Sequence, residues 1–181
     1  MYRLFSARTV LPALAALAAV CVAALAASAA STGAAVTYIN EKYGFSLSLP
    51  ADIFAPGDPR NPEQGGLWMS RDGQARLIAV ATANESGESL AAYRSFVMLQ
   101  SYKNATFDYT PVRDTWFVLS GKQEGRVFYE RITFACGGRY IYGWQLEYPA
   151  AEKKLYDRVV EQIHRSYKPG RGEDGRCGRT P

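Results

Sequence analysis

An uncharged apolar run near the N-terminus limits what this chain can fold into. No charged residue occurs between Arg8 and Glu41, and the residues from Val10 to Ala26 are mostly Leu, Val and Ala. A basic start, an apolar run and the small-residue sequence Ala27-Ser28-Ala29 are the three parts of a secretory signal. We therefore expect residues 1–29 to be a signal peptide that forms an N-terminal helix, and the folded domain to begin after it.

Two other fates of this segment remain open. If it is not cleaved it could anchor the protein in the inner membrane, because about 18 apolar residues can span a bilayer. Cys21 could instead carry the lipid of a lipoprotein, although the branched Val20 precedes it where a small residue is expected. Because alanine is only weakly hydrophobic, the sequence favours cleavage and a periplasmic or secreted protein.

The charge of the mature chain excludes one class of function. The 181 residues include 21 Lys and Arg against 17 Asp and Glu. Cleavage after Ala29 would remove Arg3 and Arg8, so the net charge falls from +4 to about +2. Phosphate recognition needs a concentrated basic face, so we expect no nucleic-acid partner. The remaining length suits one domain with a sizeable core.

Short strand patterns separated by Gly and Pro turns fill most of that domain. The expected strands cover residues 36–39, 45–49, 68–70, 75–83, 107–113, 116–120, 126–135 and 140–148. The proline-rich stretch from Ala55 to Gly66 is expected to be a surface loop. Apolar residues recur at helical spacing from about Leu90 to Tyr102 and again from Ala151 to Tyr167. Two helices on a largely antiparallel sheet of six to eight strands make an α+β fold.

Two segments carry a resemblance to a known family. The opening Tyr43-Gly44-Phe45-Ser46-Leu47-Ser48-Leu49-Pro50 and the closing helix around residues 156–163 resemble the PsbP-like fold family, and most of all uncharacterised exported proteins of alphaproteobacteria. The resemblance covers residues 38 to about 169 and implies an α/β/α sandwich, and we expect a single domain, residues 36–169. The tail, residues 170–181, is rich in Gly, Arg and Pro and is expected to be irregular. The resemblance also implies an accessory or binding role, since the family has no shared catalytic site, and it carries no functional residue over to this chain.

The cysteines suggest a covalent link. Without Cys21 the mature chain keeps two cysteines, Cys136 and Cys177, the even number expected of an exported protein with one disulfide. Such a bond would tether the C-terminal tail to the domain. A buried Cys136 with a free Cys177 is the alternative. Their spacing fits neither a redox pair nor a zinc site.

Few residues suggest catalysis. His164 is the single histidine, and a lone histidine near the end of a helix is more often a surface residue than a catalyst. Glu130 shares the alternation of Phe128, Ile132 and Phe134, which places a carboxylate on an apolar strand face. We expect it to pair with an arginine or to lie at a sheet edge, with a general base as the less favoured alternative.

The remaining patterns point to binding. The acidic residues Asp52, Asp58 and Glu63 do not have the spacing of a calcium loop, so we expect no metal and no cofactor. Tyr140, Tyr142, Trp144, Leu146 and Tyr148 share one strand face, which we expect to be core rather than a binding platform. The sequence therefore predicts an exported, non-enzymatic accessory or binding protein whose partner is a protein or an envelope component, contacted through the loop 55–66 or the opposite, polar strand face. The alternative is a small cell-envelope hydrolase that uses a carboxylate such as Glu130.

Overall fold

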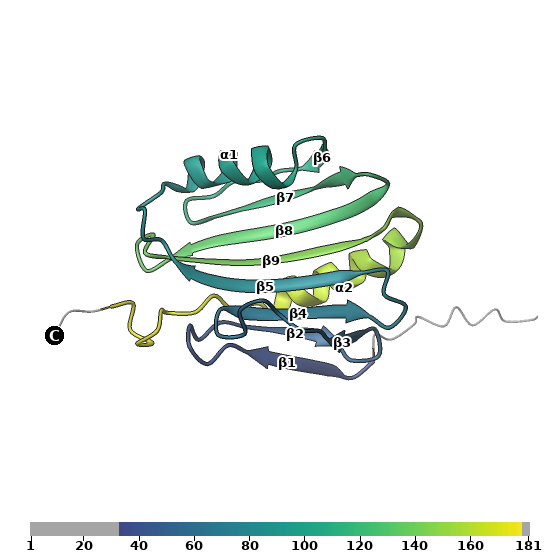
Figure 1. Cartoon of the computed structure of the whole chain (residues 1–181), viewed down its shortest axis with the longest axis horizontal. Coiled ribbons are helices and arrows are strands. Elements are labelled where there is room, and N and C mark those ends of the chain that lie inside the picture. Colours follow the sequence, from purple (N-terminus) through teal and green to yellow (C-terminus); the bar gives the residue numbers. More distant parts are fainter. Residues whose placement is uncertain (1–32, 179–181) are drawn as a thin grey trace, which may run out of the picture. The chain divides into compact units, whose positions relative to one another are not determined.

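The computed structural model describes residues 33–178, and the predicted signal peptide, residues 1–29, lies outside them together with Cys21. Nine strands and two α-helices occur within the described range (Figure 1). The strands are β1 (Ala35–Ile39), β2 (Ser46–Pro50), β3 (Phe54–Pro56), β4 (Gly65–Ser70), β5 (Arg76–Ala83), β6 (Thr106–Tyr109), β7 (Trp116–Gln123), β8 (Arg126–Ala135) and β9 (Tyr140–Pro149). The helices are α1 (Leu90–Ser101) and α2 (Lys153–Ser166), the second preceded by a short 3-10 turn, Ala150–Glu152.

Seven of the strands form one antiparallel sheet. Their order is β3-β4-β5-β9-β8-β7-β6, so the two longest strands, β8 and β9, lie at or next to the centre. Side chains on each strand alternate between the two faces of the sheet, which is why the period-two patterns of the sequence locate these strands. The α+β fold expected from the sequence is therefore confirmed.

One face of this sheet is covered by α2 and by the hairpin of β1 and β2. The alternating aromatic residues of β9 point into this layer, and Tyr142, Trp144 and Tyr148 are at most 2% exposed. Tyr156, Val159 and Ile163 of α2 are also buried there, one helical turn apart. The prediction that this aromatic face is core is confirmed.

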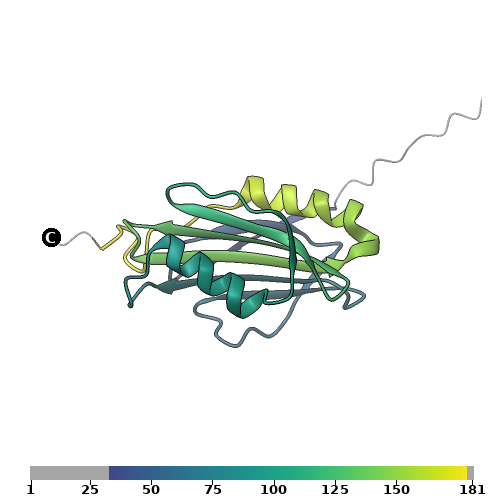
Figure 2. The same cartoon turned by 90° about the horizontal axis from the view of Figure 1, so that it is seen from above.

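The opposite face is covered by α1, so the helices lie on the two sides of the sheet (Figure 2). Val97 of α1 packs on Phe117, Ile132 and Phe134 from β7 and β8. The Ser89 side chain accepts a hydrogen bond from the Ala92 backbone N–H and caps the start of the helix. A largely exposed helix held by one buried residue depends on such local contacts.

Replacing Ser89 with alanine should therefore lower the free energy of unfolding by about 1 kcal/mol, because it removes this cap. Chemical denaturation of wild type and Ser89→Ala measures the difference. Ser95→Ala is the matched control, since the Ser95 hydroxyl donates only to the Ala91 carbonyl within the helix. Equal denaturation midpoints for Ser89→Ala and wild type would show that the cap contributes nothing.

Three details of the strands and loops differ from those expected. The strands β1 and β2 pair with each other in a separate two-stranded sheet, because β2 uses its other edge to bind Lys168 after α2. The predicted loop 55–66 is shorter, since its ends belong to β3 and β4 and only residues 57–64 lie between strands. Strand β7 also continues through Gly121 to Gln123, where a Cβ on Gly121 would come within 2.0 Å of the Thr106 carbonyl oxygen.

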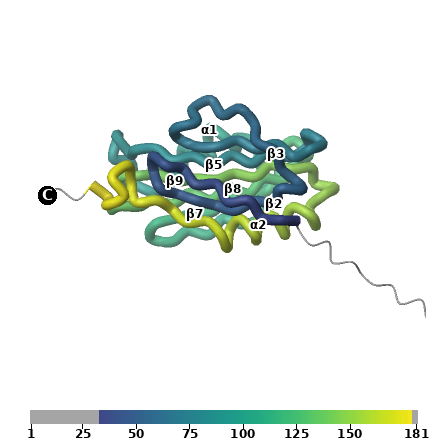
Figure 3. The backbone as a smooth tube through the Cα atoms, turned by 90° about the horizontal axis from the view of Figure 1, so that it is seen from below, coloured from purple at the N-terminus to yellow at the C-terminus, as the bar shows by residue number. Residues whose placement is uncertain are grey.

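The segment after α2 runs back beside β2, and its residues 167–178 form no helix or strand (Figure 3). A disulfide joins Cys136, just after β8, to Cys177. Arg139 reinforces this link by donating hydrogen bonds to the carbonyls of Cys136 and Gly178, each at 3.1 Å. The tail is thus held by a covalent bond and by polar contacts. No helix between residues 33 and 178 is long and apolar enough to cross a membrane.

Candidate functional site

Helix α1 covers only half of its face of the sheet. It packs over β7, β8 and one end of β9, whereas the side chains that β5 presents on the same face are not covered by a helix. Ile78 is half-buried, and Val80 is 43% exposed. An apolar strip on a central region of a sheet is normally buried, so its exposure marks this half of the face as a candidate binding surface.

The segment between β3 and β4 forms a wall beside this strip. It contains Asp58, Pro59 and Arg60 and, with β4 and β5, encloses a cavity of about 490 Å³. The apolar part of its lining comes from Leu67, Ile78 and Val80. The proline-rich loop that the sequence suggested for partner contacts therefore does lie against an open apolar surface.

A second, more polar cavity of about 350 Å³ adjoins the first, and Arg76 lines both. Glu147 of β9 binds two cations at its rim: Arg76 at 3.2 Å and Arg126 in a closer ion pair. Arg126 also donates to the Gln74 carbonyl at 2.6 Å. These contacts fix the charged groups in place before any ligand binds. We call the two adjoining cavities the α1-side groove.

Tyr102 and Gln145 form the floor of the polar cavity. Tyr102, which follows α1, stacks on Phe128 with ring centroids 4.0 Å apart. Its hydroxyl accepts a hydrogen bond of 2.8 Å from the Gln145 amide. Burial, and after it the charge of Glu130, raises the pKa of Tyr102 above its ordinary value, so the phenol stays protonated and can donate a hydrogen bond.

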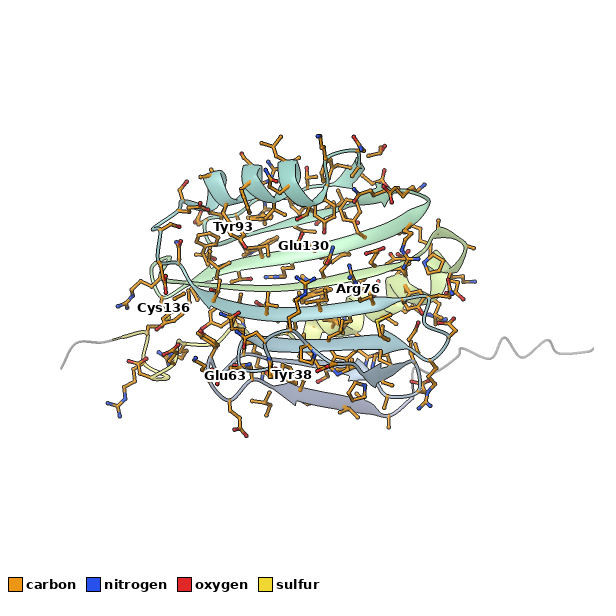
Figure 4. All side chains as sticks on the ribbon, viewed as in Figure 1. Tyr38, Glu63, Arg76, Tyr93, Glu130 and Cys136 are labelled. Carbon is orange, nitrogen blue, oxygen red and sulfur yellow. A yellow bond between two sulfur atoms is a disulfide. The ribbon has the colours of Figure 1, made fainter. Side chains whose placement is uncertain are left out.

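Glu130 lies on β8 (Figure 4), and it is opposite Gln145 in the strand register. The predicted pairing with arginine is wrong: no ion pair to Glu130 occurs among residues 33–178, and β8 is an inner strand rather than an edge. Its Oε2 atom is inaccessible to solvent and has no hydrogen-bond partner in that range. Burial raises the pKa of the Glu130 carboxyl to about 7, and the Tyr102 hydroxyl opposes part of this rise.

The other residues singled out in the sequence do not join this group. His164 faces the other side of the sheet, where its ring lies 3.1 Å from the Arg131 guanidinium. Burial and then the charge of Arg131 lower the pKa of His164, which favours the neutral ring. No cluster of three potential metal ligands occurs in the described part of the chain. Glu130 lines neither cavity of the groove.

Several solved structures share this architecture at low identity. CyanoP, the cyanobacterial PsbP of Synechocystis sp. PCC 6803, aligns with a TM-score of 0.58 and 12% identity over 76% of this chain and 93% of its own. The fold is PsbP-like. The Ran-binding protein Mog1p of Saccharomyces cerevisiae aligns with a TM-score of 0.53 and 9% identity over 76% and 96%. No protein-family model and no curated protein matches the chain. Identities this low establish the PsbP-like fold alone.

Sequence reasoning did not find the groove of this PsbP-like domain. It named the loop 55–66 and the polar face of β9 separately, and the structure brings them to the same side of the sheet through Arg76, Gln145 and Glu147. The sequence did contain one signal. Arg76, Ile78 and Val80 lie at every second position of β5 and so share one face, and two of the three are apolar. No second helix was available to cover them.

Proposed function

We propose that this protein is an exported, non-enzymatic accessory protein that binds a protein partner in the α1-side groove. The observation that carries this proposal is the open apolar strip of Ile78 and Val80 beside a rim of fixed charges. Apolar contact area surrounded by ordered polar groups is the usual composition of a protein interface. Mog1p is a Ran-binding protein of the same fold, which makes a protein ligand a reasonable occupant here.

Export is a further part of the proposal. It rests on the signal-like residues 1–29, on the resemblance to exported alphaproteobacterial proteins and on the disulfide, a bond that persists in oxidising compartments. The intact mass of the exported protein tests it. A mass equal to that of residues 30–181 supports cleavage after Ala29, whereas the mass of the full chain would indicate a membrane anchor.

A photo-cross-linking residue at Val80 should capture one protein in near-equal amount when the full chain is expressed in its own cells. The matched control carries the same residue at Lys154, which is exposed on α2 on the other side of the sheet. In a second variant the cross-linking residue is moved to a position next to Val80, and Val80→Glu is introduced as well. Capture should then weaken by about tenfold, since a charge placed on a buried apolar contact costs roughly 1.4 kcal/mol or more. Equal capture at Val80 and Lys154, or none at Val80, contradicts a partner in the groove.

The unpaired Glu130 keeps a hydrolase as the second candidate. A buried carboxyl with a pKa near 7 has the property of a general base, but it must also reach a substrate. If Glu130 is a base, any esterase or glycosidase activity of the purified protein should fall at least about a hundredfold in Glu130→Gln. Activity that is unchanged by this substitution would exclude Glu130 as its source.

A further inference from the structure

Within residues 33–178, strand β1 pairs through only one of its two edges. On its inner side β2 pairs with it, and Ser46 and Ser48 of β2 turn their own backbone groups away from β1 toward Lys168 and Ser166. In an antiparallel pair, a residue directly opposite such a position also directs its backbone N–H and C=O groups away from the partner strand. The N–H and C=O groups of Ala35, Thr37 and Ile39 therefore face away from β2, and no residue between 33 and 178 pairs with them. Figure 1 shows β1 at the outer margin of the fold.

The other strand edges of the domain carry features that discourage pairing, and β1 carries none. Strand β3 has three residues and ends in Pro56, while β6 has four, includes Asp108 and changes register between Phe107 and Tyr109. Short edges, proline, charge and bulges are the usual means by which proteins block strand addition. In contrast, β1 is Ala-Val-Thr-Tyr-Ile, without charge, proline, glycine or bulge.

The side chains of β1 leave apolar surface next to this free edge. Val36 is 53% exposed and Ile39 is 62% exposed. Tyr38 holds the strand in place, since its ring packs edge-on against Trp68 with centroids 4.9 Å apart. The strand is thus fixed to the core, and its edge is ready to pair without rearrangement.

A cavity of about 610 Å³ lies at the end of β1. It is lined by residues 38–42 together with Pro62 and Glu63. The Asn40 amide donates to the Glu63 carbonyl at 2.9 Å and so fastens the proline-rich loop to the end of the strand, and Figure 4 shows Tyr38 and Glu63 side by side there. A segment paired with β1 would pass this cavity and could place one side chain in it.

The charge around the cavity indicates which side chain that is. The Lys42 ammonium forms ion pairs with the carboxylates of Glu63, at 3.1 Å, and Glu173, at 3.8 Å. Glu41 adds a third carboxylate and forms no ion pair within residues 33–178. Three carboxylates against one ammonium leave a net negative site, which a lysine or arginine would complement.

We propose that the free edge of β1 binds an extended segment of a partner protein as an added strand, with a lysine or arginine of that segment in the acidic cavity at residues 38–42. This surface is distinct from the α1-side groove and goes beyond the function proposed above. A second copy of the chain is a poorer occupant, because antiparallel self-pairing would bring the uncharged residues 33–35 toward the cavity rather than a cation.

Backbone amide exchange tests the proposal directly. The probe is a peptide of about ten residues that alternates valine and threonine and carries a lysine at each end, so that either strand direction brings one lysine to the cavity. It is compared with the same peptide carrying a glutamate at each end. On adding the lysine peptide to the mature protein, the outward amides of Ala35, Thr37 and Ile39 should exchange at least about tenfold more slowly. The inward amides of Val36 and Tyr38 are already paired with β2 and should change little.

Thr37→Pro supplies the matched variant, since it removes one outward N–H and leaves the pairing with β2 intact. It should weaken the lysine peptide by about tenfold or more, whereas Thr37→Ala, which keeps the N–H, should bind nearly as wild type does. The lysine peptide should also bind about tenfold more tightly than the glutamate peptide, and Glu41→Gln with Glu63→Gln should reduce that preference.

Three results would overturn this proposal: no protection of the outward amides by either peptide, equal binding by Thr37→Pro and Thr37→Ala when both are folded, or self-association that Thr37→Pro abolishes. None of them bears on the groove. Capture at Val80 is measured separately. If it persists while the peptide tests fail, the proposed function stands and the β1 edge is rejected. If it is lost while peptide binding is intact, the reverse holds.

Discussion

Removing the Cys136–Cys177 disulfide should lower the free energy of unfolding by about 4 kcal/mol. The bond closes a loop of 41 residues, and the chain-entropy model assigns a loop of that size a loss of unfolded-state freedom of this order. The folded state should change little, because the tail keeps other contacts: Ser46 still pairs with Lys168, and the Gly172 backbone N–H still donates to the Tyr142 hydroxyl at 2.9 Å.

Urea denaturation of wild type with and without a reductant measures this effect, and the double variant Cys136→Ser with Cys177→Ser is the control. The reduced wild type and the double variant should unfold at the same, lower urea concentration, while reductant should not move the double variant. A chain that ends at Pro169 separates the two roles of the tail, since it lacks the bond and the contact of Gly172 with Tyr142 but keeps the pairing of Ser46 with Lys168. If reductant leaves the wild-type midpoint unchanged, the link does not stabilise the fold.

The cysteine pair was predictable because so few alternatives existed. With Cys21 in the apolar N-terminal run, only Cys136 and Cys177 remained to pair. The aromatic face of β9 was predictable for a different reason. Side-chain direction on a strand is a local property, so the alternation of Tyr142, Trp144 and Leu146 is enough to place them together.

What the sequence could not supply depends on long-range geometry. The separate pairing of β1 with β2 follows from the contact of Ser46 with Lys168, more than a hundred residues later, and no local pattern encodes it. The groove depends on how far α1 extends across the sheet. Its helical spacing identifies the helix but does not indicate that Ile78 and Val80 lie beyond its reach.

Glu130 illustrates both cases in one residue. Strand alternation correctly places it on the α1 face with Phe128 and Ile132. Whether a buried carboxylate has a cation beside it depends on what another element brings, and here the end of α1 brings Tyr102 instead of an arginine. The expectation of an arginine partner failed because it relied on a general rule for buried charges, and this carboxyl obeys the rule in another way, by favouring its neutral form.

Glu130→Gln should therefore stabilise the protein at alkaline pH and leave it almost unchanged in mild acid. Burial raises the pKa of Glu130 from 4.5 to about 7, so the native state holds a proton that the unfolded state has released. Stability then falls as the pH rises from about 4.5 through about 7, and above that range the ionised carboxylate costs up to about 3 kcal/mol. Glutamine has nearly the same shape and never ionises, so the variant avoids this cost.

The difference in unfolding free energy between Glu130→Gln and wild type should be near zero at about pH 4.5 and should grow to roughly 2–3 kcal/mol by about pH 8. Taking the difference cancels the carboxylates that the two proteins share. Glu124→Gln is the matched control, because Glu124 is an exposed residue at the rim of the same groove. A difference that does not vary with pH would mean that Glu130 is ionised in the folded protein throughout this range, and that water or a cation reaches it from the groove. Such a result would also indicate that a substrate can reach the carboxylate, and it would favour a hydrolytic role.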